Sequence, residues 1–391
     1  MWSMEGMNER LKAAAAKLLL TEDCFYLYDE AGIRSRARAL TRSFPSAKIL
    51  YSLKANPFLP VARVMKEEGF GADAASAAEV RLAVSLGMMK EEIQYSAPGK
   101  RAKDIRETLE LATLVADSAG EIARIEEAAK EKGIHVSIGL RIHPSFGFAG
   151  GRGEPSKFGI DEEEAITLLN DWHFPHLSPA GIHVHLKSQE LSEEALALYY
   201  ENVLLMAERL GRTEAMELSF VNLGSGIGIP MDPEDEEMDL ALLEKAFAAL
   251  AGPFHDRFPK ALDRKVSEGK VFLITAGTMH GFLRPALARL VEKYDETGHP
   301  ALCEPLFSGA RAFPISTLRE GNPETVTITG NLCTAADIIA EDITLPRLAE
   351  GDGIVIGNAG AYAATLSPFA FSSLERPKEF LLKETGDLEG V

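Results

Sequence analysis

The chain of 391 residues is too long for one ordinary domain, and its length fits one large α/β barrel with a second unit, or two mid-sized domains. Its 41 Lys and Arg residues against 59 Asp and Glu residues give a formal net charge of −18, which argues against a nucleic-acid partner or an anionic membrane surface. The three cysteines, Cys24, Cys303 and Cys333, have neither CxxC nor zinc-ligand spacing, so we expect no disulfide framework and no metal site.

The sequence also lacks a recognisable targeting or membrane signal. No uninterrupted apolar run is long enough to span a bilayer. The N-terminal segment contains acidic residues, and its Ala/Leu run is interrupted by Lys17, unlike a secretory signal. We therefore expect a soluble protein of the reducing cytoplasm.

Short β-prone runs recur along the first part of the chain. They cover residues 47–52, 70–76, 92–97, 112–117, 136–143, 180–186, 218–224 and 271–277. Most are followed by segments with apolar residues at i, i+3 and i+4 spacing, such as AAEVRLAVSLGM and AGEIARIEEAAKEKG. Strands that alternate with helices in this number predict an α/β fold, a (β/α)8 TIM-type barrel.

The pattern changes after residue 278. Runs such as TVTITGNLC and DGIVIGNAGAY are typical of strands, and no amphipathic helices separate them. The apolar-alternating run CFYLYDE, which begins at Cys24, precedes the barrel and fits the same β unit. We therefore predict a barrel over residues 28–270 and a discontinuous, mainly β domain over residues 1–27 and 271–391.

Polar and glycine residues gather at the ends of the predicted strands, where such barrels carry their functional groups. These residues are Lys54, Asp73, Ser96, Asp117, Arg141, His143, His185, Ser188, the glycines of GSGIG and Gly277. For Lys54 alone, the alternative is a strand that has simply reached solvent. A random surface pattern would scatter polar residues along the helices instead.

The segment VNLGSGIGIP, residues 221–230, places three glycines in a turn after a strand. Glycine lets backbone N–H groups approach an anion closely, so the turn suits a phosphate, although glycine-rich loops also occur without one. No Lys-Ser/Thr pair follows, so the segment is not a P-loop. A lysine that faces a phosphate site favours pyridoxal 5'-phosphate (PLP), whose aldehyde condenses with an amine.

Seven motifs in order resemble those of one enzyme family. They are YSLKANP (51–57), FGADAASAAEV (70–80), SKFGI (156–160), GIHVHLKSQ (181–189), VNLGSGIGIP (221–230), GNLCTAAD (330–337) and GNAGAY (357–362). Together they resemble the fold-type III PLP-dependent decarboxylases, which include ornithine, diaminopimelate and arginine decarboxylases. The second half is also similar to the branch of siderophore and antibiotic pathways. The resemblance implies an alanine-racemase-like barrel, PLP as the cofactor and a homodimer with shared active sites.

The resemblance also implies roles for single residues. Lys54 would hold PLP through its amine, and His185 would stack on the pyridine ring, with Asp73 and Arg141 beside it. The phosphate ligands would be Ser188, Gly224, Ser225, Gly226, Gly228, Gly277 and Tyr362.

Three further positions match residues that act at the dimer interface of that family. Cys333 would come from the partner subunit and return a proton after CO2 leaves. Lys157 and Asp337 would form a salt bridge across the dimer.

Several of these residues also have ordinary structural interpretations. Asp73 and Arg141 fit a structural ion pair, and His185 fits a core histidine. Cys333 fits a small buried hydrophobe, and Tyr362 fits an aromatic side chain at a domain interface.

The sequence departs from the family pattern after the predicted eighth strand. There the family has Glu-Pro-Gly-Arg, and this chain has Thr275-Ala276-Gly277-Thr278. Thr275 would replace the glutamate that keeps the pyridine nitrogen protonated, which would weaken decarboxylation more than PLP binding. Thr278 would replace the arginine, and Lys187 could supply the lost positive charge at the phosphate. The alternative for Lys187 is a solvated lysine on the barrel rim.

The expected substrate residues differ as well. Thr334 stands where the family has an acidic residue that binds a diamine, so free ornithine or lysine would lose that partner. Arg311 or Lys187 could instead bind a carboxylate of a larger intermediate that contains an amino acid.

The sequence thus predicts a PLP-dependent carboxy-lyase that acts on an amino acid or an amino-acid conjugate. A racemase or epimerase on the same fold is one alternative, because such enzymes use a weak electron sink. A catalytically weakened regulatory homologue is the other, although Lys54, His185, Cys333 and Tyr362 are all present.

Overall fold

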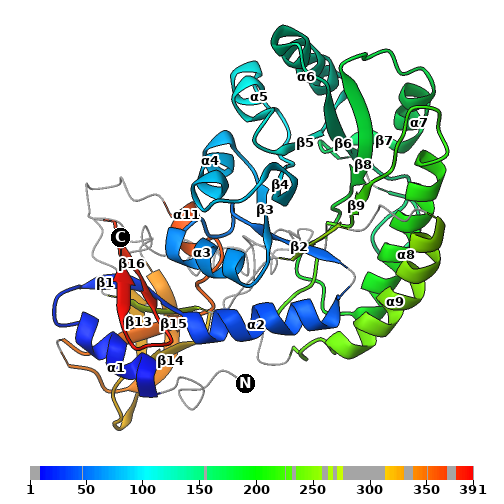
Figure 1. The fold of residues 1–391 in the computed structure, drawn as a ribbon. Coiled ribbons are helices and arrows are strands. Elements are labelled where there is room, and N and C mark those ends of the chain that lie inside the picture. Colours follow the sequence, from blue (N-terminus) through cyan, green and yellow to red (C-terminus); the bar gives the residue numbers. More distant parts are fainter. Residues whose placement is uncertain are drawn as a thin grey trace.

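The computed structural model describes residues 9–45, 47–153, 156–224, 226–230, 235–257, 263–266, 271–275, 313–329, 338–349, 351–367 and 376–390. These residues form a barrel and a β-rich unit beside it (Figure 1).

The barrel is a closed ring of parallel strands. In order around the ring they are β5 (Thr113–Ala116), β4 (Ile93–Tyr95), β3 (Gly71–Ala74), β2 (Lys48–Ser52), β10 (Asp263–Val266), β9 (Phe220–Asn222), β8 (Leu177–His183) and β6 (Val136–His143), which pairs with β5 again. The short strand β7 (Ile160–Asp161) pairs with β6 beside the ring. The predicted (β/α)8 barrel is therefore confirmed.

Helices connect the strands and lie outside the ring (Figure 1). They are α2 (Glu30–Ser43), α3 (Leu59–Glu67), α4 (Ala77–Ser85), α5 (Ala102–Thr108), α6 (Ala119–Lys132), α7 (Glu162–Asn170), α8 (Glu193–Leu210) and α9 (Leu240–Arg257), with a 3₁₀ turn at Lys90–Glu92. Two of them begin with the same Ser-x-x-Glu pattern. The hydroxyls of Ser76 and Ser118 each accept a hydrogen bond, 3.2 Å long, from the backbone N–H of Glu79 and Glu121 respectively. This satisfies N–H groups that the first helical turn leaves free.

Phe220 on β9 packs against the glycines of two neighbouring strands. A β-carbon at Gly181 on β8 would lie 2.5 Å from the Phe220 ring, and one at Gly139 on β6 would lie 2.8 Å from it. The two glycines therefore provide the space for one large aromatic side chain between the strands.

The second unit contains a six-stranded sheet and a hairpin. The sheet has the order β12 (Ile315–Thr317), β15 (Ile354–Gly357), β11 (Val271–Thr275), β1 (Cys24–Asp29), β16 (Lys378–Leu382) and β17 (Leu388–Gly390). The hairpin joins β13 (Pro323–Thr329) to β14 (Ile338–Pro346). Helix α1 (Glu9–Leu18) packs Leu11 and Leu18 against Phe25 and Leu27 of β1.

The N-terminal strand β1 lies inside the sheet of the C-terminal half. It pairs antiparallel with β11 and parallel with β16. Residues from both ends of the chain therefore form one sheet, while the domain boundaries at residues 27/28 and 270/271 stay a prediction.

One predicted strand belongs to the other unit. The run 271–277 was expected as the eighth barrel strand, but β11 (Val271–Thr275) pairs with β1 and β15 in the second sheet. The eighth barrel strand is β10, whose residues Asp263–Val266 pair in parallel with β2 and β9. The prediction was wrong because VFLIT is continuously apolar, whereas DRKV is mostly charged and resembles a surface segment.

In the part of the chain that the structure describes, no helix combines the length and apolar character needed to cross a bilayer. The same part contains no group of three or more His, Cys, Asp or Glu side chains arranged to hold a metal ion.

Candidate active site

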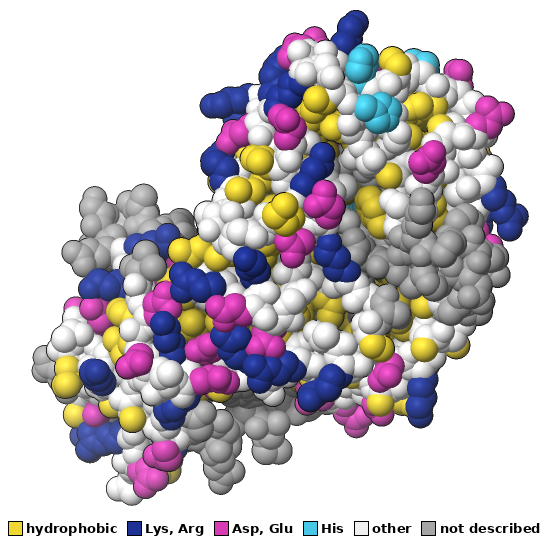
Figure 2. All heavy atoms as spheres, in the orientation of Figure 1, with side chains coloured by type: hydrophobic (Ala, Val, Ile, Leu, Met, Phe, Trp, Pro, Cys, Tyr) yellow, Lys and Arg dark blue, Asp and Glu magenta, His cyan; other side chains and the backbone are white. Residues whose placement is uncertain are grey.

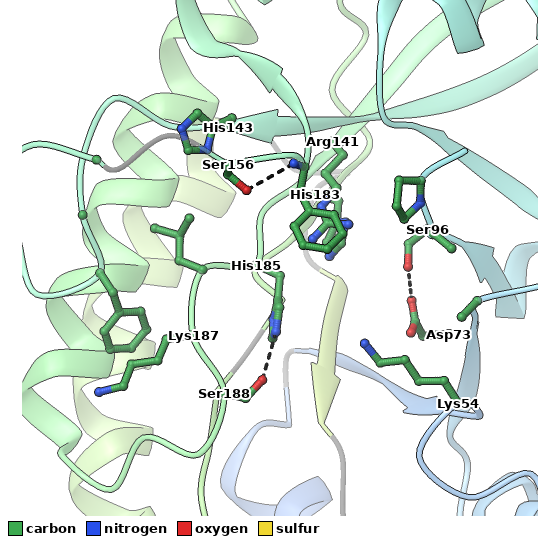
Figure 3. A pocket seen from close by; sticks show the side chains of 18 of the residues that line it. Lys54, Asp73, Ser96, Arg141, His143, Ser156, His183, His185, Lys187 and Ser188 are labelled. Carbon is green, nitrogen blue, oxygen red and sulfur yellow. Dashed lines mark hydrogen bonds between the residues drawn. The ribbon is translucent and has the colours of Figure 1, made fainter. Parts of the chain in front are cut away.

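A cavity of about 810 Å³ opens at the carboxyl ends of the barrel strands (Figure 3). The predicted residues that line it are Lys54, Asp73, Arg141, His185, Lys187, Ser188 and Tyr362. Residues from β2, β3, β6 and the segment after β8 thus meet in one place, although they are far apart in the sequence. This is the position at which a (β/α)8 barrel carries its chemistry.

Lys54 lies in a tight turn directly after β2, and its side chain points into the cavity (Figure 3). The turn is held by its own backbone: the N–H of Ala55 donates to Ser52 (3.1 Å), and the N–H of Leu53 donates to Asp73 (3.0 Å). The hydroxyl of Tyr51 donates to the carbonyl of Asn56 (2.8 Å). The lysine amine therefore extends from a fixed base.

The GNAGAY segment of the C-terminal half holds the same turn from the other side. The Asn56 side-chain amide donates to the carbonyl of Gly360 (3.1 Å), and the N–H of Tyr362 donates to the carbonyl of Ala55 (2.8 Å). Tyr362 adopts a left-handed backbone conformation with φ of 62°, which is unfavourable for a non-glycine residue. The two sequence motifs around Lys54 and Tyr362 therefore form one structural unit at the cavity.

Asp73 is buried at the end of β3, and two hydroxyl groups bind its carboxylate. Ser96 donates to Oδ1 at 2.5 Å, and Ser52 donates to Oδ2 at 3.3 Å. Figure 3 shows the pair of Ser96 and Asp73 on the same side of the cavity as Lys54. These bonds fix the carboxylate in one orientation next to the lysine.

Arg141 forms its ion pair with Asp117, a strand-end residue to which no role was assigned from the sequence. The guanidinium Nη1 lies 3.5 Å from Oδ1 of Asp117, and both side chains are buried. Burial raises the pKa of Asp117, and the positive charge of Arg141 opposes that rise. Arg141 is thus paired with Asp117 and not with Asp73, its partner in the structural alternative, while Asp73 adds a further negative charge to the surroundings of Arg141.

The buried side chain of Lys100 links two of the loops that follow barrel strands. The ammonium of Lys100 donates to the carbonyls of Ala97 (2.7 Å) and Val115 (2.6 Å) and to Glu121 (3.0 Å). Burial lowers the pKa of Lys100, and Glu121 opposes this effect. The pair links the loop after β4, which lines the cavity, to the loop after β5, which carries Asp117.

His185 and Ser188 lie across the cavity from Lys54 (Figure 3). The ring nitrogen Nε2 of His185 and the hydroxyl of Ser188 form a hydrogen bond of 3.2 Å. The bond orients the edge of the imidazole ring that faces Ser188.

The Lys187 side chain points away from Lys54 and Ser188 (Figure 3). Its ammonium donates to the Glu190 carboxylate at 2.5 Å and lies 5.4 Å from the centre of the Phe148 ring. The expected positive charge beside Ser188 is therefore already neutralised by Glu190. This arrangement corresponds to the alternative, a lysine on the barrel rim.

The glycines of the segment 221–230 let its backbone pack closely against the segment that follows β8. A β-carbon at Gly224 would lie 2.0 Å from the carbonyl oxygen of Val184, and one at Gly226 would lie 2.3 Å from that of Lys187. The N–H of Gly228 donates to the carbonyl of Glu190 (2.8 Å). None of these glycines is among the residues that line the cavity, so their evident role is the close packing of the segment that carries His185 and Ser188.

We expect Gly224→Ala to lower the free energy of unfolding by more than Gly133→Ala. Both glycines have left-handed backbones, with φ of 67° and 65°, and alanine there costs roughly 1–2 kcal/mol. Only Gly224 adds a clash with Val184, because a β-carbon at Gly133 meets nothing within 4 Å. Urea unfolding of both variants measures the difference, and equal destabilisation would contradict the packing role.

His183 is a buried cavity residue that sequence reasoning missed. It lies on β8, opposite Arg141 on β6, and lines the cavity together with His185. A signal was present, because residues two apart in a strand share one face, and the motif contains His-Val-His. Further lining residues come from the segment after β6, including His143, Phe146, Phe148, Arg152 and Phe158.

Most of the remaining predicted positions cannot be placed in the fold described above. Ser225, Gly277, Thr278, Arg311, Cys333, Thr334 and Asp337 lie outside the described residues. Thr275 ends β11 in the second sheet, in register with Cys24 and Ile354, so the expectation that it ends a barrel strand is wrong. Lys157 is exposed, and its ammonium lies 4.9 Å from the centre of the Phe158 ring.

The residues present fit PLP. The site offers a lysine amine on a fixed turn, an imidazole opposite it, hydroxyl groups and a buried carboxylate. The glycines after β9 let the backbone pack closely against the segment that carries His185 and Ser188. An amine for the aldehyde and polar donors for the phosphate are the groups that this cofactor requires.

Two family models match the chain. Residues 30–266 match the pyridoxal-binding domain of the pyridoxal-dependent decarboxylases, and residues 259–360 match their C-terminal sheet domain. The first match ends at the last residue of β10.

Characterised proteins match along most of the chain. Diaminopimelate decarboxylase of Methanothermobacter thermautotrophicus is 30% identical over 381 residues, which cover 92% of this chain and 86% of that protein. The L-glutamyl-[BtrI acyl-carrier protein] decarboxylase of Niallia circulans is 28% identical over 405 residues, which cover 94% and 90%. The crystal structure of diaminopimelate decarboxylase from Helicobacter pylori with L-lysine has a TM-score of 0.77 at 24% identity and covers 96% of this chain and 95% of that one.

Proposed function

The chain belongs to the fold-type III PLP-dependent decarboxylases, and from this premise we propose which of its residues carry the reaction and what kind of substrate it takes. It is a PLP-dependent carboxy-lyase that acts on an amino acid or an intermediate that contains one. The observation that carries the residue assignment is the position of Lys54, which faces His185 and Ser188 across one cavity.

Bound PLP supplies an electron-withdrawing ring that lowers the barrier to loss of CO2 from an attached amino acid. Lys54 provides the amine to which the cofactor is joined, and the surrounding hydrogen bonds fix the turn that carries it. His185, held by its bond to Ser188, would pack on the ring, and Ser188 with Tyr362 would contribute donors for the phosphate. Cys333 would supply the proton to the carbon from which CO2 leaves.

The corrected end of the barrel changes which residue we assign beside the pyridine nitrogen. The family has Glu-Pro-Gly-Arg after its eighth strand, and the sequence that directly follows β10 is Ser267-Glu268-Gly269-Lys270. We propose Glu268, which stands one residue later than the glutamate of that pattern, as the carboxylate in place of Thr275, and Lys270 as the cation in place of Lys187. On this assignment the chain would keep the charges that favour decarboxylation.

For the substrate, we propose an amino acid or amino-acid conjugate other than free ornithine or free lysine. Thr334 replaces the acidic residue that would bind a distal ammonium group, which disfavours ornithine and lysine. The two relatives act, by their names, on diaminopimelate and on an L-glutamyl carrier protein, so the family accommodates such variation. Release of CO2 by the PLP-loaded protein from a panel of free and conjugated amino acids tests this proposal.

We also propose a cytoplasmic homodimer in which Lys157 pairs with Asp337 of the partner subunit. In support, Lys157 is exposed and forms no ion pair within the described part of the chain. Cys333 would enter the partner's cavity across the same interface, so each active site needs both subunits.

Reversal of either charge is expected to weaken the dimer. Lys157→Glu and Asp337→Lys should each raise the dissociation constant at least about tenfold, because like charges then face each other. The double variant should restore the dimer, which sedimentation velocity measures. Lys103→Glu, at an exposed lysine of α5, is the matched control. A double variant as weak as the single ones would contradict the pairing.

A further inference from the structure

A short hairpin, residues 145–153, covers one side of the cavity. Phe146 and Arg152 form an antiparallel bridge, and the N–H of Gly153 donates to the carbonyl of Ser145 (2.9 Å). The turn contains Gly150 and Gly151, whose φ angles of 88° and 76° suit glycine. The hairpin therefore has a defined conformation set by its own backbone.

A buried carboxylate fixes the base of this hairpin to the barrel. The N–H and the hydroxyl of Ser145 both donate to Glu162, at 3.2 and 2.9 Å. Glu162 is only 3% exposed, and the guanidinium of Arg209 on α8 pairs with its other oxygen. The hairpin side chains are thus held at a constant place relative to the strand ends.

Aromatic side chains from this region form an apolar wall. Phe146, Phe148 and Phe158 line the cavity. Phe148 stacks on Tyr199 with ring centres 4.9 Å apart, and Phe158 packs 4.3 Å from the guanidinium of Arg141. This wall gives the cavity an apolar side next to the hairpin.

Arg152 is the charged residue of the hairpin, and it lines the cavity. The neighbouring charged groups have partners: Arg141 pairs with Asp117, and Lys187 pairs with Glu190. Arg152 forms no ion pair within the described part of the chain. An arginine is always protonated, and its planar fork matches carboxylate and phosphate groups. Among the described residues, the hairpin therefore offers the cavity an exposed positive charge that no carboxylate pairs with.

The hairpin lies on the opposite side of the cavity from Lys54. It follows His143 in the chain, and Phe148 lies under the ammonium of Lys187. Figure 3 shows His143 and Lys187 on one side and Lys54 with Asp73 on the other. A substrate whose reacting end is at Lys54 would extend its distal end toward the hairpin.

We propose that Arg152 binds an anionic group at the distal end of the substrate and thereby selects amino acids or conjugates with a second acidic group. The inference rests on the proposed function, because it takes the reacting end of the substrate to be at Lys54. It assigns substrate selection to a residue of the hairpin, in addition to Arg311 and Thr334.

The test compares pairs of ligands that differ in one anionic group. The pairs are meso-diaminopimelate with L-lysine, L-glutamate with L-glutamine, and O-phospho-L-serine with L-serine. We expect the PLP-loaded protein to bind the acidic member of at least one pair roughly 10- to 100-fold more tightly, as for a charge-assisted hydrogen bond, by calorimetry. Arg152→Gln should abolish this preference without changing the affinity for the neutral member, and Arg152→Lys should retain part of it.

The control is Arg106→Gln, which removes the same charge from an exposed arginine of α5 that pairs with Glu131. It should leave all the affinities unchanged. The pair that responds to Arg152→Gln distinguishes a carboxylate from a phosphate. The proposal would be overturned if the unchanged protein showed no preference for the acidic ligands. It would also be overturned if Arg152→Gln lowered the affinity for both members of a pair equally, or if this variant dissociated the dimer.

Release of CO2 is measured separately from these affinities. Arg152-dependent binding without release of CO2 from any ligand would support the inference and contradict the residue roles proposed for the reaction. Release of CO2 without an Arg152-dependent preference would do the reverse.

Discussion

Replacement of Lys54 with alanine is expected to lower the rate of CO2 release by roughly 10³-fold or more, as is usual when a covalent catalytic group is removed. The variant should also lose the visible absorbance that PLP acquires when it is joined to the protein. The reason is geometric, since Lys54 is the lysine that points into the cavity opposite His185 and Ser188 (Figure 3).

We expect Lys54→Ala to leave the turn that carries residue 54 intact. Backbone bonds and Tyr51 hold the turn around Lys54, and none of these contacts uses the lysine side chain. The fold should therefore survive, which circular dichroism checks. Lys103→Ala removes an exposed lysine of α5 and serves as the control, with unchanged absorbance and rate. Retained absorbance and activity in Lys54→Ala would contradict the assignment.

Replacement of Glu268 with glutamine is expected to lower kcat about 10²- to 10³-fold while PLP stays bound, because removal of one electrostatic group at a reacting centre has such an effect. The assignment is a proposal from the sequence that follows β10. Strand β10 pairs with β2 and β9, so the segment after the eighth strand begins at Ser267. A carboxylate beside the pyridine nitrogen keeps that nitrogen protonated, and an amide does not.

Thr275→Val is the matched control for this prediction, because Thr275 is the residue that the sequence pattern alone would place there. Its strand β11 belongs to the second sheet, so its loss should change kcat little. Absorbance titration with PLP separates cofactor binding from catalysis in both variants. A large loss in Thr275→Val with normal activity in Glu268→Gln would contradict the corrected strand assignment.

Much of the barrel could be predicted because its strands and caps have local signals. The runs that became β2 to β6, β8 and β9 are apolar and β-prone, and Ser76 and Ser118 mark helix starts through their Ser-x-x-Glu pattern. The expected cluster of polar strand ends also exists, with Lys54 and His185 in one cavity.

The features that could not be predicted depend on pairings between residues far apart in the sequence. The short charged run DRKV completes the barrel because β2 and β9 lie on either side of it, and no local property of the run reveals this. Asp117 pairs with Arg141 because β5 and β6 are neighbours, and no local sequence pattern indicates this pairing. The hairpin with Arg152 had no predicted role, since its place over the cavity depends on the buried Glu162.

The most direct test is a single turnover in D2O with PLP-loaded protein in excess over a candidate amino acid, followed by mass spectrometry. We expect one CO2 per substrate molecule, and a product amine that carries one new deuterium on the carbon that lost the carboxyl group. Lys54→Ala should give neither. Recovery of the amino acid with its carboxyl group intact and deuterium on its α-carbon would show proton exchange instead, and would contradict the central claim of decarboxylation at Lys54.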